Sequence, residues 1–235
     1  MTRLKTILFL VSLFSLMSCD QLNSIKTIRL AHGLSTNHSV HKGMLHFGER
    51  LKEISGGRFK VQIYPSQQLG TERQCLELLQ IGSLDMTKVS AGVLENFSPS
   101  IKVFGIPYIF KDKEHTFKVL DGPIGKQLLA STEKYLLKGL GYYDSGSRSF
   151  YTINKPIEKP NDLKGLKIRV MESQTAIDMV KSFGGSPTPI SWGELYTALQ
   201  QGVVDGAENN PPSFYLSRHY EVCKYYNIDE HTVIP

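Results

Sequence analysis

The sequence has few cysteines and none of the spacings that bind structural zinc. Only Cys19, Cys75 and Cys223 occur in 235 residues, without a CxxC pair or a cysteine–histidine cluster. Histidines are frequent between residues 32 and 46, but they do not form an HExxH motif. We therefore expect no metal and no cofactor. We expect two separate buried thiols at Cys75 and Cys223, although an oxidising compartment would permit a disulfide between them.

The sequence also lacks the motifs of common enzyme classes. It contains no GxSxG nucleophile motif, no P-loop and no GxGxxG segment that opens a helix after a strand. Its basic residues form no stripe with interleaved aromatic residues, which argues against nucleic acid as a partner. With 40% hydrophobic and 21% charged residues, the composition is that of an ordinary globular protein. A binding protein is therefore favoured over an enzyme.

An apolar run at the N-terminus is too short to span a bilayer. It covers residues 7–17 and follows two basic residues, an order typical of a signal peptide over residues 1–18. The run ends in Leu-Met-Ser-Cys, which resembles a bacterial lipobox with Cys19 as the lipidated residue. An ordinary signal peptide that happens to contain Cys19 is the alternative. Because Asp20 resembles an inner-membrane retention signal, we expect a periplasmic protein anchored by lipid to the inner membrane, with residues 19–26 as the tether.

Hydrophobic periodicity alternates between strand and helix in the first half of the chain. Residues 27–32 and 59–64 have strand patterns, and apolar residues spaced by three and four between 40 and 54 indicate a helix. Thr71 and Gln74 form a capping box that opens a second helix, and residues 85–90 indicate a third strand. This order predicts an α/β fold with a largely parallel sheet.

A second α/β cycle follows a Ser-Gly-Ser break at residues 145–147. Strands are predicted at 140–144, 150–154 and 166–170, a helix at 174–183, and a second capping box at Ser191 and Glu194. The chain contains no long linker, so we expect domain I over residues 27–145 and domain II over residues 146–235, joined by short crossings near 145. The sequence ends at Pro235 in what resembles a cut strand, which indicates a C-terminally truncated chain with an incomplete domain II.

Polar side chains gather near the predicted strand ends, where open α/β sheets bind ligands. His32 follows the first strand, Arg169 ends a later strand, and Arg148, Trp192 and Asn209 lie close to other strand ends. A guanidinium matches a carboxylate in bidentate geometry, so Arg169 is the main candidate for binding an acid. The alternative for Arg169 is a solvated residue at a strand end. Without residues 1–18 the basic count falls from 27 to 25 against 22 acidic residues, and this small positive excess suits an anionic solute.

Four segments together resemble the substrate-binding proteins of tripartite ATP-independent periplasmic (TRAP) transporters, the DctP family. They are Tyr64–Gly70, Gly105–Phe110, Asp162–Val170 and Ser186–Asn209. The resemblance implies a periplasmic-binding-protein-like fold of two α/β domains that close around the solute like a flytrap. It also implies a small organic acid and the TRAP membrane permease subunits as partners.

The resemblance implies a role for each matching residue. Arg169 matches the arginine that forms a salt bridge to the solute carboxylate, Arg148 a supporting arginine, and Asn209 an asparagine that contacts the same carboxylate. Trp192 matches an aromatic wall, and Glu72 lies where a polar residue of the first domain reaches solute hydroxyls.

The resemblance also narrows the solute class. Sialic-acid binders of this family carry an acidic and a basic residue where this chain has Ser90 and Val93, which argues against sialic acid. Residues 143–151 look more like those of members that take up uronic acids or other sugar acids. A C4-dicarboxylate solute, and a role as the solute sensor of a membrane receptor, remain alternatives.

Overall fold

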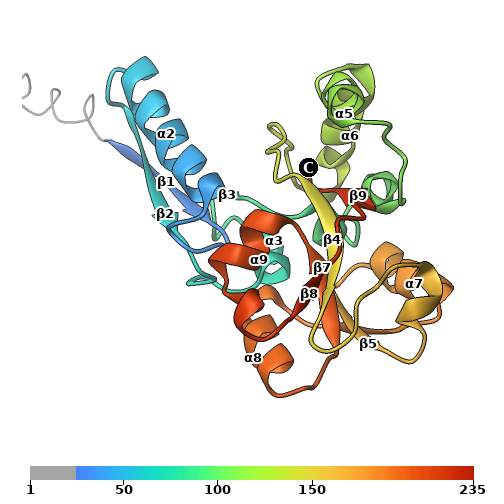
Figure 1. Ribbon diagram of the computed structural model, residues 1–235. Helices are drawn as coiled ribbons and strands as arrows, with labels where there is room; N and C mark the ends of the chain where they lie inside the picture. Colours follow the sequence, from blue (N-terminus) through green and yellow to red (C-terminus); the bar gives the residue numbers. More distant parts are fainter. Residues whose placement is uncertain (1–24) are drawn as a thin grey trace, which may run out of the picture.

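The computed structural model describes residues 25–235, which contain two β-sheets (Figure 1). The predicted signal peptide, Cys19 and most of the predicted tether lie outside the described residues. The first sheet has the order β2-β1-β3, and the second has the order β6-β5-β7-β4-β8 with β9 paired to β4. The first is built from residues 26–87 and the second from residues 147–233. The predicted division into 27–145 and 146–235 stays a prediction.

The first sheet is parallel throughout and is built from two strand–helix–strand units. Its strands are connected by two helices, and the elements in chain order are β1 (Lys26–Ala31), α2 (Ser39–Ile54), β2 (Phe59–Tyr64), α3 (Glu72–Gln80) and β3 (Met86–Thr87). Val40 and Met44 on α2 are buried against Leu30 of β1, as the spacing of the apolar residues predicts. The expected capping box is present: Thr71 Oγ1 accepts from Gln74 N, and Gln74 Oε1 accepts from Thr71 N.

Short helices fill the chain between the two sheets. They are α4 (Ala91–Leu94), η1 (Pro99–Gly105), α5 (Lys113–Leu120), α6 (Pro123–Ser131) and η2 (Glu133–Tyr135). The predicted strand at 140–144 is wrong, because this segment pairs with no strand among residues 25–235. Its Tyr142 packs edge-on against Phe104 and donates its hydroxyl to the Gly125 carbonyl at 2.8 Å. The apolar pattern therefore reflects packing against helices and not a strand.

The second sheet mixes parallel and antiparallel pairs. β5 (Lys167–Val170) is parallel to β6 (Ser186–Pro189) and β7 (Gly206–Asn209), whereas β4 (Ser147–Thr152) is antiparallel to β7. The prediction of a largely parallel sheet therefore holds for the first sheet and for the β6-β5-β7 part of the second. The remaining elements are η3 (Pro160–Leu163), α7 (Gln174–Ser182), η4 (Trp192–Glu194), α8 (Leu195–Gln200), α9 (Pro211–Leu216), η5 (His219–Glu221), β8 (Tyr225–Tyr226) and β9 (Thr232–Val233).

Two local predictions have different outcomes. The second capping box is wrong, because Ser191 Oγ donates to the Glu194 carboxylate at 2.6 Å and no side chain caps the backbone there. The chain instead enters α8 through the 3₁₀ turn η4. The prediction of separate buried thiols is confirmed, since Cys75 and Cys223 are both buried and free.

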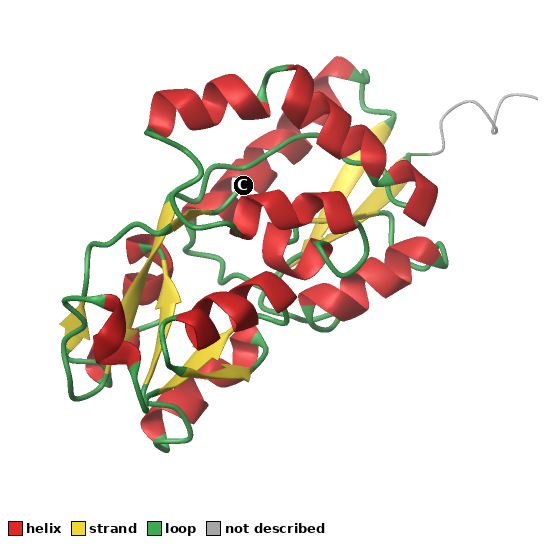
Figure 2. Cartoon of the chain, turned by 90° about the vertical axis from the view of Figure 1, so that its right-hand side faces the viewer, coloured by secondary structure: helices red, strands yellow, loops and turns green. Residues whose placement is uncertain are grey.

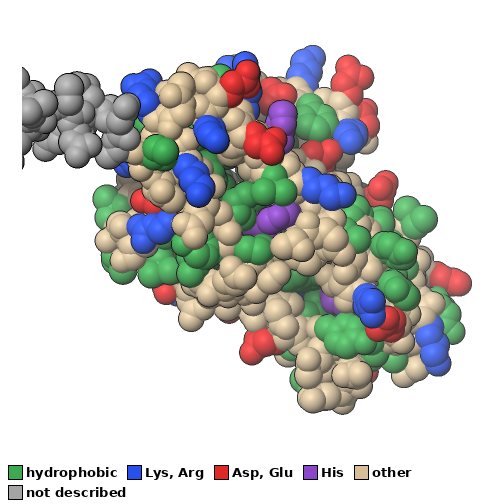
Figure 3. Space-filling view, turned by 90° about the vertical axis from the view of Figure 1, so that its left-hand side faces the viewer, with side chains coloured by type: hydrophobic (Ala, Val, Ile, Leu, Met, Phe, Trp, Pro, Cys, Tyr) green, Lys and Arg blue, Asp and Glu red, His purple; other side chains and the backbone are tan. Residues whose placement is uncertain are grey.

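Helices surround the strands of both sheets, so apolar clusters form between the layers (Figure 2). One such cluster includes Phe150 and Ile168 of the second sheet and Val180 of α7. On the face shown in Figure 3, basic and acidic side chains are interspersed. No helix within residues 25–235 combines the length and apolar character that a membrane span requires.

Candidate functional site

The strand ends of both sheets face a common cleft of about 700 Å³, including its open mouth, which is a size suited to a small molecule. Lys88 directly follows β3, Arg169 lies near the end of β5, and Asn209 is the last residue of β7. Because β4 runs antiparallel to β7, its second residue, Arg148, reaches the same edge. The topology thus places two arginines and an amide at one end of the second sheet, opposite residues of the first.

Arg169 is a buried cation with an unused hydrogen-bond donor. It is 2% exposed, and its Nε donates to the Ile190 carbonyl at 2.8 Å. Its Nη1 is buried and has no hydrogen-bond partner among the described residues. Burial lowers the pKa of Arg169 to about 10, so the side chain remains charged at neutral pH. A buried charge with an unsatisfied donor is costly, and a carboxylate in the cleft would remove that cost.

Arg148, in contrast, is already paired. Its Nε and Nη2 both bond to the Glu208 carboxylate, and Nη2 also donates to the Glu208 carbonyl at 2.8 Å. Its Nη1 lies 3.7 Å from Met171 Sδ. Burial alone would raise the pKa of Glu208, but Arg148 and His231 lower it to about 2. The Arg148–Glu208 pair therefore carries no net charge toward a solute.

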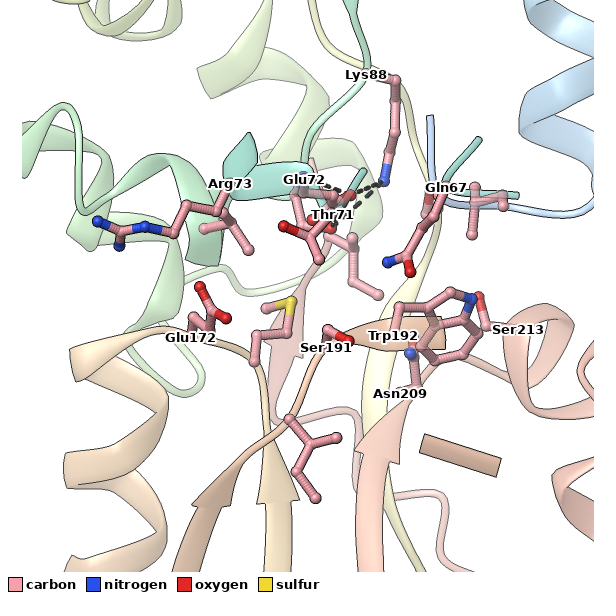
Figure 4. Close-up of a pocket in the computed structure, with 18 of the residues that line it drawn as sticks. Gln67, Thr71, Glu72, Arg73, Lys88, Glu172, Ser191, Trp192, Asn209 and Ser213 are labelled. Atoms are coloured by element: carbon pink, nitrogen blue, oxygen red, sulfur yellow. Dashed lines mark hydrogen bonds and ion pairs between the residues drawn. The ribbon is translucent and has the colours of Figure 1, made fainter. Parts of the chain in front are cut away.

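Asn209 and Trp192 form one wall of the cleft. The Asn209 Oδ1 accepts from Asn210 N at 2.8 Å, which leaves the side-chain NH₂ as the free end of the amide. Figure 4 shows this amide below the Trp192 indole, with Gln67 on the opposite side of the ring. The Arg169 guanidinium carbon lies 5.8 Å from the centre of the Trp192 ring. The wall thus combines a flat apolar surface with an amide donor beside the free cation.

Glu72 lies on the opposite side of the cleft and is held in a dense set of hydrogen bonds. Its Oε1 accepts from Lys88 Nζ at 3.3 Å and from Ser90 N and Oγ at 3.2 Å each (Figure 4). The side chains of Lys88 and Glu72 are only 11% and 15% exposed. Val93 also lines the cleft. The first sheet therefore contributes a second internally balanced ion pair.

His32 lies outside the cleft lining, unlike the other predicted site residues. Its Nδ1 accepts from Leu34 N at 3.1 Å, so its Nε2 carries the proton and donates to His41 Nδ1 at 2.9 Å. Burial lowers the pKa of His32 to about 4. Since both ring nitrogens are used within the first sheet's loops, the expected placement of His32 at the solute is corrected. His38 lines the cleft instead, and its Nε2 lies 3.3 Å from Ser213 Oγ.

The chain matches the family described as bacterial extracellular solute-binding protein, family 7 (DctP), over residues 30–235. It belongs to this family. The Salmonella typhimurium protein YiiZ is 47% identical over 210 residues, covering 88% of this chain and 64% of that protein. Across three curated relatives, the chain spans 58–64% of the relative's length.

Solved structures of DctP-family proteins share this fold. A TRAP periplasmic solute-binding protein from Bradyrhizobium, with bound galacturonate, is 44% identical at a TM-score of 0.86, with 89% of this chain and 70% of that chain covered. Another from Anaerococcus prevotii, with bound glucuronate, is 42% identical at a TM-score of 0.87, with 89% and 68% covered. The predictions of the DctP family and of the two-domain binding-protein fold are confirmed. The family consists of solute-binding receptors and not of enzymes, as the sequence motifs indicate.

Several residues in the cleft or next to it were not predicted from the sequence. Glu208 had a detectable signal, because it is an acidic residue inside the predicted strand-end segment that also holds Asn209. Lys88 had a weaker one, as a cation at the end of the third predicted strand. Gln67 lies in the family-like segment Tyr64–Gly70, but the pattern does not show that its side chain reaches the cleft. His38 lies in a loop whose path the pattern does not determine. Among residues 25–235, no group of three or more His, Cys, Asp or Glu side chains could hold a metal ion.

Proposed function

We propose that this protein is the extracytoplasmic solute receptor of a TRAP-type transporter, and that it captures a monocarboxylated sugar acid for a membrane permease. The observation that carries the proposal is Arg169, a residue of the cleft lining whose buried Nη1 has no partner among the described residues. Asn209 and Trp192 stand beside it as an amide donor and a flat wall. In this proposal the units 27–145 and 146–235 are the two halves that enclose the solute.

The buried charges of the cleft favour a solute with a single negative charge. Arg148 is balanced by Glu208 and Lys88 by Glu72, so Arg169 is the one buried cation of the lining that no carboxylate of the described residues balances. One solute carboxylate would complete this charge balance. A second carboxylate would bring an unbalanced negative charge into a site shielded from water, which is costly.

Two further charged residues of the lining lie toward solvent. Arg73 is half exposed and forms an ion pair with Glu77 at 3.1 Å. Figure 4 places Arg73 and Glu172 together at one side of the cleft, away from Trp192 and Asn209. Because exposed charges are screened by water and salt, they change the balance of the buried part little.

The first sheet's side of the cleft suits solute hydroxyls. Glu72 Oε1 already accepts three hydrogen bonds, whereas its second oxygen has no partner among the described residues. A sugar hydroxyl can donate to that oxygen, and the Trp192 ring offers a surface the size of a sugar ring. The bound galacturonate and glucuronate of the two relatives support a uronate.

The second candidate solute is a C4-dicarboxylate. Lys88 is the observation that favours it, because an ammonium group in the cleft could bind a second carboxylate if Glu72 moved away. A relative from Sulfurospirillum deleyianum that is 33% identical has bound succinate. Calorimetric titration with D-glucuronate, D-galacturonate, succinate and malate tests the choice. We expect the uronates to bind at least about tenfold more tightly, a difference of about 1.4 kcal/mol; the reverse order would refute the sugar-acid assignment.

A genetic experiment distinguishes delivery of the solute to a permease from a role in sensing. We expect cells that lack this protein to lose uptake of radiolabelled uronate, and uptake to return when the gene is restored. Normal uptake together with a lost transcriptional or chemotactic response to the same uronate would support the sensor alternative.

Anchoring by lipid at Cys19 is part of the proposal for the mature protein. The basic, apolar, Leu-x-x-Cys order of the N-terminus supports it. Cys19→Ala should abolish incorporation of labelled palmitate and release the protein from the membrane fraction. If Cys19→Ala is labelled like the wild type, the lipobox interpretation is wrong.

A further inference from the structure

A buried histidine lies behind the aromatic wall and is not part of the cleft lining. His219, the first residue of η5, is 1% exposed, and its ring centre is 5.2 Å from that of Trp192. Trp192 in turn lies near Arg169, with 5.8 Å between the guanidinium carbon and the ring centre. His219 thus supports the one aromatic side chain that lies beside the free cation of the cleft.

His219 is itself held rigidly by the second sheet. Its Nδ1 lies 2.8 Å from the Tyr151 hydroxyl, and Tyr151 is a fully buried residue of β4. Tyr151 packs against Phe214 and Tyr226, with ring centres 4.9 and 6.0 Å away. A sheet residue therefore fixes the orientation of His219, although His219 comes from a short 3₁₀ turn.

The surroundings also keep His219 uncharged. Burial, and to a lesser extent the charge of Arg169, lowers the pKa of His219 to about 4. Two tyrosines also lie beside its ring. The Tyr151 hydroxyl is 2.8 Å from Nδ1, whereas the Tyr196 ring on α8 is 6.4 Å away and its hydroxyl donates to Glu221. A neutral imidazole can pack against the indole without adding a second positive charge beside Arg169.

Trp192 needs such support because its own element is short. It opens the three-residue turn η4 and is only partly buried, so its orientation depends on the side chains that pack against it, which include the apolar cluster around Leu195 as well as His219. We propose that His219 is a positioning residue of the solute site, which holds the Trp192 indole in the orientation that places it beside Arg169; this inference rests on the proposed function of the cleft. Fixing a side chain before the solute arrives removes an ordering cost from binding.

The test uses Trp192 as its own reporter, because it is the single tryptophan of the sequence. In the full chain, His219→Ala should weaken D-glucuronate binding about three- to tenfold, the range expected when one side chain must be ordered on binding. It should also increase quenching of the tryptophan fluorescence by acrylamide in the absence of solute. His219→Phe, which keeps the aromatic packing, should restore both values to near wild type. His46→Ala, at an exposed histidine of α2, is the matched control.

A double-variant cycle decides whether His219 acts through Trp192. In a Trp192→Ala background, His219→Ala should weaken D-glucuronate binding by less than about twofold. The inference is overturned if His219→Ala has the same effect in both backgrounds, or if quenching in folded His219→Ala equals that of the wild type. Should His219→Ala not fold, His219→Val, which removes the aromatic ring but leaves a smaller void, takes its place with the same expected increase in quenching. Quenching is measured without solute and therefore tests the positioning of Trp192 independently of binding. If the wild type binds no uronate, the proposed function is refuted, whereas the quenching result still decides whether His219 positions Trp192.

Discussion

Replacing each cleft arginine with methionine should affect stability in opposite ways. Arg148→Met leaves the Glu208 carboxylate, which is 1% exposed, without its main partner. Arg148 and His231 together hold the pKa of Glu208 at about 2 instead of its ordinary 4.5 in spite of its burial, so Arg148 accounts for a part of about 3 kcal/mol. Loss of one partner of a buried pair costs about 3–5 kcal/mol. For a chain of this size we expect the Tm to fall by roughly 6–20 °C.

Arg169→Met removes a buried cation that no carboxylate of the described residues balances and whose Nη1 has no partner there. The Tm of the solute-free protein should therefore stay the same or rise. The affinity for D-glucuronate should fall about thirty-fold to several-thousand-fold, the equivalent of about 2–5 kcal/mol for losing one side of a desolvated charge pair. Arg169 thus contributes to binding and Arg148 mainly to the folded state.

Thermal unfolding with and without saturating D-glucuronate, together with calorimetric dissociation constants, measures both quantities. The dependence of stability on pH provides a second test. Because the pKa of Glu208 is lowered in the folded protein, the stability from its pair with Arg148 is present above about pH 4.5 and is lost as pH falls toward 2. The Tm gap between wild type and Arg148→Met should shrink over that range. The reasoning is refuted if Arg169→Met lowers the Tm as much as Arg148→Met and still shows the wild-type increase in Tm on adding D-glucuronate.

Three further predictions concern specificity, pH and thiol chemistry. Glu72→Gln frees Lys88 from its ion pair, so the ratio of succinate to D-glucuronate affinity should rise at least about tenfold by calorimetry; an unchanged ratio would show that this pair does not select the solute. The pKa of His219 is lowered from 6.5 to about 4, so the stability linked to its neutral form is present above pH 6.5 and is lost as pH falls through 4. In urea unfolding between pH 6 and 4.5, the unfolding free energy of wild type should therefore fall about 1.4 kcal/mol per pH unit more steeply than that of His219→Phe, and equal slopes would contradict this. Burial raises the pKa of Cys75 and raises that of Cys223 to about 12, so Ellman's reagent should label both thiols slowly in the native protein and rapidly in urea; fast native labelling would disprove their burial.

Local periodicity was sufficient for most helices and strands. The strand predicted at 59–64 is β2 (Phe59–Tyr64), and the helix predicted at 174–183 is α7 (Gln174–Ser182). In both segments the spacing of the apolar residues, with a period of two in the strand and of three to four in the helix, shows which face is buried. Each segment therefore specifies its own secondary structure. The segment 140–144 has the same apolar character, but whether it pairs with a strand depends on distant residues that the segment does not specify.

The arrangement of the site depends on such long-range pairing. Arg148 and Arg169 have the same side chain near strand ends, but only Arg148 has a carboxylate opposite it, from a residue 60 positions further along the chain. That pairing follows from the antiparallel register of β4 and β7, whereas the sequence predicted only a largely parallel sheet. The sequence therefore singled out both arginines as site candidates but did not show which arginine is already neutralised.

The difference between the two arginines is itself an argument about function. A residue retained only for folding is expected to have its charge and donors satisfied, as Arg148 does with Glu208. Arg169 keeps a buried Nη1 without a partner in the described part of the chain, and burial lowers its pKa to about 10. Both features destabilise the solute-free protein, and an apolar side chain of similar size would avoid them. Proteins tolerate such local costs mainly at functional sites, where a ligand supplies the missing interaction. The arginine that we expect to contribute less to folding is thus the one to which we assign the solute carboxylate.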